Sequence, residues 1–130
     1  MPEFGKYEKI PRPESIEAFI KYLNSNPIVI NIERKGLQVV EIIRKEKSNV
    51  KVFMTNIYIV SLADVYEILS EVEQVDAIVT MSAWNSYTKE AKEECKKRGI
   101  GLFSFKEFMG AVYYDGQQFL DYVHPDDRKK

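Results

Sequence analysis

The amino-acid sequence predicts an α/β domain built on one mixed β-sheet with helices on both faces. Its 130 residues are close to the most common size of a single domain. Three apolar segments with strand periodicity follow one another at residues 28–34, 37–46 and 50–59, which is typical of an antiparallel meander. Apolar segments at 76–81 and 101–104 then alternate with helical patterns. A meander followed by alternating helices and strands favours a mixed sheet.

The first twelve residues are expected to form an extended arm, because they contain Pro2 and Pro11 and show little periodicity. Pro13 then suits the first turn of a helix. Residues 24–27 contain the breakers that predict its end. Between them, one helical stripe has the i, i+3, i+4, i+7 spacing of a buried face: Ile16, Phe19, Ile20 and Leu23.

Turn residues separate the three strands of the predicted meander. Gly36 follows the first strand, and Ser48 with Asn49 follows the second. After the third strand, Ser61 and Asp64 have the spacing of a capping box, so a second helix is expected to begin there. One face of this helix is apolar and consists of Leu62, Val65, Tyr66, Leu69 and Val72.

The clearest helix signals surround a third helix that follows the strand at 76–81. Ser86 or Thr88 can cap its first turn, where Glu90 also lies. Gly99 is expected to terminate the helix. Basic residues, which stabilise a helix C-terminus, fill its last turn: Lys96, Lys97 and Arg98.

Residues 106–123 are expected to add a short helix and a β-hairpin. Ser104 and Glu107 form a second capping box, and the pair Asp115-Gly116 is favoured in type I′ hairpin turns. Residues 124–130 are expected to be a solvated tail. The apolar face of the short helix consists of Phe105, Phe108, Met109 and Val112.

Composition indicates a soluble globular protein, with 45% hydrophobic and 30% charged residues. The single cysteine, Cys95, has no partner for a disulfide or a zinc knuckle, which fits a reducing compartment. No apolar segment approaches the roughly 18 residues of a membrane span, and the N-terminus lacks a signal-peptide core. We therefore expect a cytoplasmic protein without a membrane partner. The net charge of −1 permits a nucleic-acid partner without arguing for one.

The second half of the chain, "VDAIVTMSAWNSYTKEAKEECKKRGIGLFSF" at residues 75–105, supplies a resemblance. A strand, a Thr-capped helix rich in Ala and Lys, and a Gly-Ile-x-Leu strand follow the meander and its helix. This order resembles the restriction endonuclease-like (PD-(D/E)XK) fold, in particular its Mrr-type and Holliday-junction resolvase-like branches. The resemblance covers residues 13–105 and implies a nuclease-like core within a single domain that spans residues 1–130.

The resemblance implies a catalytic site like that of active family members, which use an acidic residue on the second strand and an (E/Q)-x-K pair on the third. Carboxylates hold Mg²⁺, while the lysine orients or activates the attacking water. At these third-strand positions the chain has Phe53 and Thr55, or Met54 and Asn56 if the register shifts by one. Neither choice supplies a carboxylate, so the catalytic motif is degenerate. The leading hypothesis is a non-catalytic protein without a cofactor that acts by binding.

The alternative hypothesis is an active Mg²⁺-dependent nuclease with relocated ligands. Glu41 is the acid on the second strand, and Glu17 could replace an acid that some members carry on the first helix. A literal E-x-K motif occurs as Glu33-Arg34-Lys35 on the first strand. Charged strand ends of this kind are usually solvated, and we expect the same of the basic residues Arg44, Lys45 and Lys47.

The residues favoured for binding are Trp84, Asn85 and Tyr87, which follow the buried strand at 76–81. In α/β proteins, ligands tend to bind where such strands end. The same residues could instead cover the edge of the core. Asn56 and Tyr58 are expected beside them, since they belong to the neighbouring third strand.

The expected partner is a nucleic acid or another protein. A third hypothesis is an oligomeric structural or regulatory protein that forms a homodimer through the C-terminal hairpin. Cys95 and the single histidine, His124, are too far apart in the predicted elements to form a nucleophilic pair. The aromatic residues of the hairpin could form the dimer face: Tyr113, Tyr114, Phe119 and Tyr122.

Overall fold

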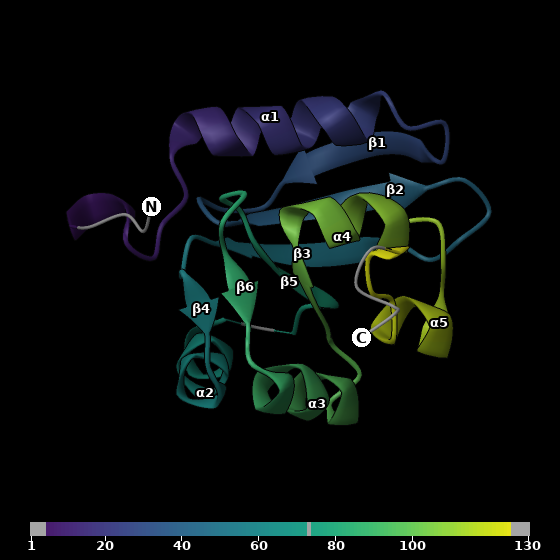
Figure 1. Cartoon of the computed structure of the whole chain (residues 1–130). Helices are drawn as coiled ribbons and strands as arrows, with labels where there is room; N and C mark the ends of the chain where they lie inside the picture. The colour runs from purple at the N-terminus through teal and green to yellow at the C-terminus, as the bar shows by residue number, and fades with distance from the viewer. Residues whose placement is uncertain (1–4, 73, 126–130) are drawn as a thin grey trace.

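The computed structural model describes residues 5–72 and 74–125. These residues form one five-stranded mixed sheet covered by helices on both faces, as the sequence predicts (Figure 1). In chain order the elements are η1 (Gly5–Tyr7), α1 (Pro13–Asn24), β1 (Val29–Arg34), β2 (Val39–Arg44), β3 (Val50–Thr55), β4 (Ile59–Val60), α2 (Leu62–Glu71), β5 (Ala77–Thr80), β6 (Ser86–Tyr87), α3 (Lys89–Lys97), β7 (Gly101–Ser104), α4 (Phe105–Ala111) and α5 (Gly116–Leu120).

The strand order in the main sheet is β1-β2-β3-β5-β7. The first three strands are antiparallel neighbours, which confirms the predicted meander. Strands β3, β5 and β7 are parallel to one another, so their carboxyl ends lie at one edge of the sheet. This edge is where the chain leaves each strand for a loop or a helix.

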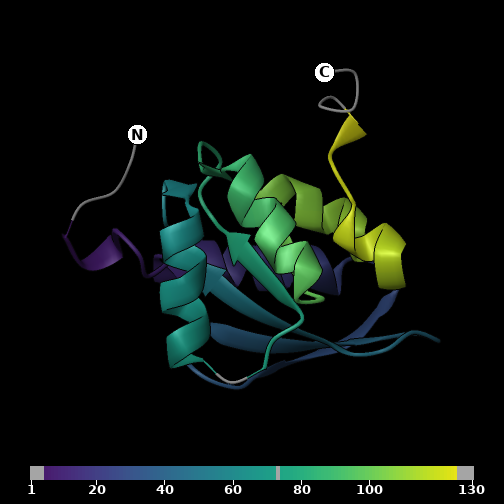
Figure 2. The ribbon, with the colours of Figure 1, turned by 90° about the horizontal axis from the view of Figure 1, so that it is seen from below.

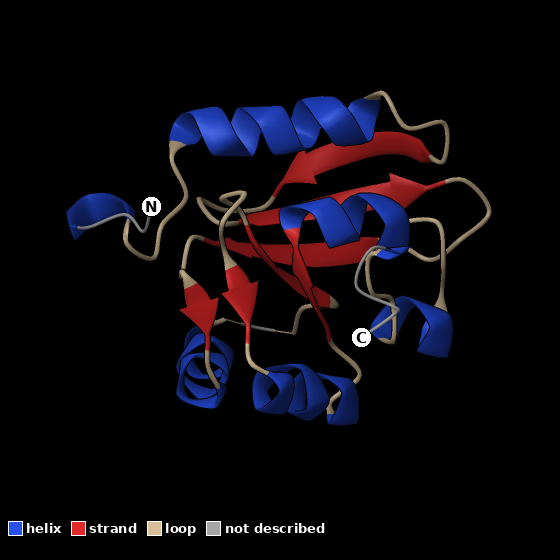
Figure 3. Ribbon diagram, in the orientation of Figure 1, coloured by secondary structure: helices blue, strands red, loops and turns tan. Residues whose placement is uncertain are grey.

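The sheet separates two hydrophobic cores. One core lies beneath α1 and α4 and contains Phe19, Phe103 and Phe108. The other lies beneath α2 and α3 and contains Val65 and Cys95. Figure 2 shows α2 and α3 side by side, and Figure 3 shows helices on both sides of the strands. The molecule therefore has three layers, with the sheet in the middle.

Local capping signals determine where the helices begin. Ser61 and Asp64 form the predicted capping box of α2, and Ser104 and Glu107 form that of α4. Of the two candidates for α3, Thr88 is the cap, because its side chain accepts a hydrogen bond from the Ala91 backbone N–H at 3.1 Å. These side chains satisfy N–H groups that would otherwise lack partners in the first helical turn.

The predicted third strand is too long. It was expected over 50–59, but β3 ends at Thr55 and the two residues of β4 pair with β6 in a separate small sheet. The N-terminal segment causes this break, because the Lys9 carbonyl accepts hydrogen bonds from the Thr55 hydroxyl and the Asn56 N–H. The predicted arm at 1–12 therefore lies on the domain over its described part, residues 5–12, but it is not extended throughout, because Gly5–Tyr7 form the 3₁₀ helix η1.

The predicted C-terminal hairpin is wrong: α5 begins at Gly116 in its place. Arg44, which was expected to be solvated, is buried and holds this region. Its guanidinium donates to the carbonyls of Val112 (3.0 Å) and Tyr114 (2.8 Å) and pairs with the Asp115 carboxylate. These contacts fix the Asp-Gly pair in a helix start. Because these residues form a helix, the predicted homodimer through a C-terminal hairpin has no structural basis.

Two residues of the predicted tail are described, His124 and Pro125; residues 126–130 lie outside the described part of the chain. A weak contact ties the start of this segment to α4, since the His124 N–H lies 3.5 Å from Glu107 Oε2.

Gly101→Ala should lower the free energy of unfolding by about 1–3 kcal/mol, the usual range for overpacking a core. A Cβ at position 101 would lie 2.6 Å from Cζ of Phe103 and 3.0 Å from Phe119, and both rings are buried. Urea unfolding of the purified variant measures the change. Gly36→Ala is the matched control, because a Cβ there has no neighbour within 4 Å. Equal stability of the two variants would contradict the packing described here.

Candidate functional site

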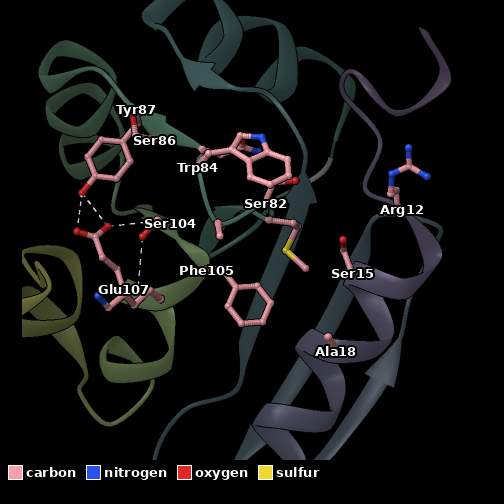
Figure 4. A pocket seen from close by; sticks show the side chains of 14 residues that line it. Arg12, Ser15, Ala18, Ser82, Trp84, Ser86, Tyr87, Ser104, Phe105 and Glu107 are labelled. Atoms are coloured by element: carbon pink, nitrogen blue, oxygen red, sulfur yellow. Dashed lines mark hydrogen bonds between the residues drawn. The ribbon is translucent and has the colours of Figure 1, made fainter. Parts of the chain in front are cut away.

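A groove of about 750 Å³ lies at the carboxyl ends of β5 and β7. Its volume is within the roughly 300–1,000 Å³ range of ligand pockets. Three segments far apart in sequence form its walls: the start of α1, the loop that leads into β6, and the start of α4 (Figure 4). The lining residues are Arg12, Ser15, Ala18, Met81, Ser82, Ala83, Trp84, Asn85, Ser86, Tyr87, Ser104, Phe105, Lys106 and Glu107.

A buried polar network holds the loop wall in place. The Asn85 side-chain amide donates to Thr80 Oγ1 and Asn56 Oδ1, both at 3.0 Å. The Ser82 hydroxyl donates to the same Asn56 oxygen at 2.6 Å, while the Asn56 amide donates to the Tyr7 carbonyl at 2.8 Å. Buried amides with satisfied partners fix one loop conformation. Asn56 and Asn85 therefore have a structural role, although Asn85 also lines the groove.

Unlike the buried Asn85 beside it, Trp84 points outward and is 49% exposed. Figure 4 shows its ring on one wall, with Ser15 and Ala18 of α1 on the other. Ser15 and Ala18 are three positions apart and therefore lie on one helix face. Since both side chains are small, the space between helix and loop stays open. Phe105 lies between the walls and packs edge-to-face on Phe19, with ring centroids 5.5 Å apart.

Tyr87 and Glu107 form the polar end of the groove. The Tyr87 hydroxyl lies 2.8 Å and 2.9 Å from the two carboxylate oxygens of Glu107. The Ser104 backbone N–H donates to the same carboxylate at 3.2 Å, as part of the α4 capping box. Glu107 is buried, and these donors compensate its negative charge. Its carboxylate is thus engaged in holding β6 to α4.

Lys92 lies behind this pair and is buried. Its ammonium donates to the carbonyls of Leu102 (2.6 Å) and Tyr122 (3.2 Å) and lies 4.3 Å from the centre of the Phe103 ring. Burial lowers the pKa of Lys92 to about 8, while the nearby Glu107 acts in the opposite direction. The side chain links α3 to β7 and to the C-terminal segment, and it does not line the groove.

Cys95 is also unsuited to nucleophilic chemistry. It is fully buried in the core beneath α2 and α3, and this burial raises its pKa to about 11. The thiol form therefore dominates at neutral pH, whereas a nucleophilic cysteine needs the thiolate.

The third-strand positions that carry metal ligands in the resembled family are filled by core residues. Phe53 packs in one core and Met54 in the other, both buried. The Thr55 hydroxyl donates to the Lys9 carbonyl at 3.0 Å. No group of three or more His, Cys, Asp or Glu side chains within residues 5–72 and 74–125 could hold a metal ion.

Three residues of the alternative nuclease hypothesis do lie together. Glu33 and Glu41 are opposite each other on β1 and β2, and Lys35 Nζ lies 3.0 Å from Glu33 and 3.8 Å from Glu41. The hydrogen bond that Lys35 donates to the Glu33 carboxylate raises the pKa of Lys35. Glu17 does not join them, because it lies on α1, which covers one face of the sheet. The residues on either side of Glu41 in β2 point to that face, so Glu41 itself points to the opposite face.

The five predicted binding residues thus have different positions. Trp84, Asn85 and Tyr87 line the groove, Asn56 lies behind it, and the exposed Tyr58 lies outside it. The α1 wall was not predicted from the sequence, and Phe105 and Glu107 were predicted only as parts of a helix. No local signal could have revealed the α1 wall, because it depends on packing between residues about seventy positions apart.

Comparisons with known proteins found no family model, curated protein or solved structure that matches the chain. Within the described part of the chain, no helix has the length and apolar character needed to cross a membrane.

Trp84→Ala should change the free energy of unfolding by about 1 kcal/mol or less, because half of the ring is already in water. Phe108→Ala is the buried control and should lose about 3–5 kcal/mol. Urea unfolding of both variants tests the difference. A loss at Trp84 as large as that at Phe108 would show that the ring belongs to the core and leave the groove without its main exposed aromatic side chain.

The pH dependence of stability tests the burial of Lys92. Its pKa is about 8 in the folded chain and should return toward 10.5 on unfolding, so the unfolded chain binds more protons between these values. The contribution of Lys92 to the free energy of unfolding should therefore rise as pH increases through this window, whereas the raised pKa of Cys95 acts in the opposite direction above about pH 9. In Lys92→Met the contribution of Lys92 should disappear, while that of Cys95 remains. Identical pH profiles for the two proteins would contradict the lowered pKa.

Proposed function

We propose that the chain is a binding protein with a restriction endonuclease-like core that has lost the metal-binding constellation, and that its binding surface is the groove beside Trp84. The observation that carries this proposal is which residues occupy the third strand. Where a nuclease of this kind needs a carboxylate and a lysine, β3 has Phe53 and Thr55, both buried and packed. A protein that keeps the core but fills this position acts through another surface.

The arrangement of elements supports the comparison with that fold. Helix α1 precedes an antiparallel meander, and α2 leads to β5, which pairs parallel with the third strand of the meander. A further helix and a parallel strand, α3 and β7, then extend the sheet. This is the order of elements that the resemblance implies for residues 13–105.

The chemistry of phosphodiester cleavage supports the non-catalytic part of the proposal. Mg²⁺ requires oxygen ligands in near-octahedral geometry, and the water it activates must be oriented toward the phosphate. The side chain of Met54, the alternative position, offers only a thioether in a dry core. A metal ion there would have to exchange water oxygens for apolar contacts.

An active nuclease is the second candidate, favoured by the proximity of Glu33, Lys35 and Glu41. These residues supply two carboxylates and one lysine, and magnesium sites in proteins are often built from one or two carboxylates. In this structure, however, Lys35 forms ion pairs with both carboxylates. The group lies on the open face of β1 and β2, away from the groove.

The protein should not cleave DNA in the presence of Mg²⁺ or Mn²⁺. Incubation of supercoiled plasmid with the purified chain and either metal, followed by electrophoresis, measures nicking and linearisation. Glu33→Ala and Glu41→Ala are the matched variants. Cleavage by the wild type that is lost in either variant would overturn the proposal and establish the second candidate. Cleavage that is equal in all three proteins would also contradict the expected result, unless the activity separates from the chain on gel filtration and so belongs to a contaminating nuclease.

A further inference from the structure

We propose that residues 5–10 form a displaceable strap that controls the conformation of the groove: when the strap leaves the end of β3, the loop that carries Trp84 loosens, because both are held by the side chain of Asn56. We call residues 81–85, between β5 and β6, the groove loop. As a statement about regulation, this inference rests on the proposed binding role of the groove. The coupling between strap and groove loop is a property of the chain itself and needs no ligand.

The strap is anchored by hydrogen bonds to two of its backbone carbonyls. The Lys9 carbonyl accepts from the Asn56 backbone N–H at 2.8 Å and from the Thr55 hydroxyl at 3.0 Å. The Tyr7 carbonyl accepts from the Asn56 side-chain amide at 2.8 Å. All three donors belong to two consecutive residues at the carboxyl end of β3, so this anchor is a single small site.

Little apolar burial adds to this anchor. None of residues 5–10 is buried, whereas Pro11, which follows them, is buried and ties the next part of the chain to the domain. The Lys9 ammonium lies 2.9 Å from the Glu67 carboxylate, but each side chain is about half exposed, and ion pairs of this kind stabilise little. Segments with few buried contacts open locally while the core stays folded. The strap has the features of such a segment.

Asn56 links the strap to the groove loop through the two ends of one amide group. Its nitrogen donates to the Tyr7 carbonyl, and its oxygen accepts from the Ser82 hydroxyl at 2.6 Å and from the Asn85 amide at 3.0 Å. A carbonyl only accepts hydrogen bonds, so the amide nitrogen must face the strap and the amide oxygen must face the loop. Strap and loop thus select the same orientation of a residue that is only 3% exposed.

Departure of the strap removes the acceptor of the Asn56 amide nitrogen. An unpaired buried donor is unfavourable, so the amide turns toward water or another acceptor, and its oxygen then leaves the donors of the groove loop. The Asn85 amide keeps its bond to Thr80 Oγ1 at 3.0 Å, so the loop loosens without detaching. Ser82 and Asn85 flank Trp84 and line the groove, and a change in their positions therefore changes the shape of the groove.

A second contact ties the strap to the α1 wall. The guanidinium of Arg12, which lines the groove at the start of α1 (Figure 4), lies 4.5 Å from the centre of the Tyr7 ring. The strap therefore contacts one wall directly and the other through Asn56. By linkage, a ligand that favours one conformation of the groove loop shifts the strap equilibrium, and a factor that displaces the strap changes the affinity of the groove.

Hydrogen exchange of the full chain, followed by NMR at low urea concentrations, tests whether the strap opens by itself. The Asn56 backbone N–H is bonded to the strap, whereas the Met81 N–H is bonded to the Thr55 carbonyl at 2.9 Å. The Asn56 N–H should exchange at least about tenfold faster and with little dependence on urea, because a local opening exposes little surface. Equal rates and equal urea dependence at the two positions would overturn the strap.

The same measurement tests the coupling at the Asn85 N–H, which is bonded within the groove loop to the Ser82 carbonyl at 2.9 Å. Lys9→Glu replaces the ion pair with Glu67 by two carboxylates, and the exposed Lys9 does not line the groove. This variant should accelerate exchange at Asn56 and Asn85 by the same factor, about fivefold, because one opening exposes both. Acceleration at Asn56 alone would overturn the coupling, and acceleration at neither would overturn the strap.

Two controls separate opening of the strap from general destabilisation. The double variant Lys9→Glu/Glu67→Lys restores opposite charges and should return both rates to within about twofold of the wild type. Arg98→Glu reverses a comparable ion pair with Glu94 on α3, which stays folded when the strap opens, and should leave both rates unchanged. If Arg98→Glu accelerates them as much as Lys9→Glu does, the proposal is wrong. Its failure leaves the proposed binding function standing, because that function is tested separately by the plasmid assay.

Discussion

The complete burial of β5 is the constraint on which the rest of the structure depends. All four of its residues are buried, and Ala77 and Val79 point into one core while Ile78 points into the other. Strands on both sides, β3 and β7, are parallel to it. Because three parallel strands end at the same edge, the chain must leave the sheet there three times. The loops and helix starts that follow are thus brought together, and the groove forms between two of them and α1.

The buried network around Asn85 converts this edge into a fixed surface. Thr80 is the last residue of β5, and its hydroxyl accepts a hydrogen bond from Asn85 while it donates to the Ile57 carbonyl at 2.6 Å. The inward orientation of Asn85 leaves the adjacent Trp84 on the outside of the turn. No buried side-chain polar atom lacks a partner within residues 5–72 and 74–125. A surface held this way is preorganised, so little conformational entropy would be lost if a partner bound there.

The sequence allowed prediction of the features that depend on local chemistry. The capping box at Ser104 and the Thr88 cap follow from hydrogen bonds within three residues along the chain. Features that depend on distant contacts could not be predicted. The pair Asp115-Gly116 has the local signature of a hairpin, but Arg44, 71 positions away, binds Asp115 and the preceding carbonyls and makes a helix start more favourable. The α1 wall of the groove was unpredictable for the same reason, since nothing near Ser15 in sequence indicates a ligand.

The packing of β3 and the presence of the groove have a common physical basis. Met54 and Met81 belong to the same core, and Met81 extends from that core to the groove. The core that contains Met54 of β3 therefore also supports the groove. A carboxylate at position 53 and a lysine at position 55 would place charges in sites with at most 8% exposure, at a cost of several kcal/mol per ion. The lysine would also remove the hydroxyl that holds Lys9. A metal site at this strand would thus require repacking of the core around Phe53 and release of the N-terminal segment.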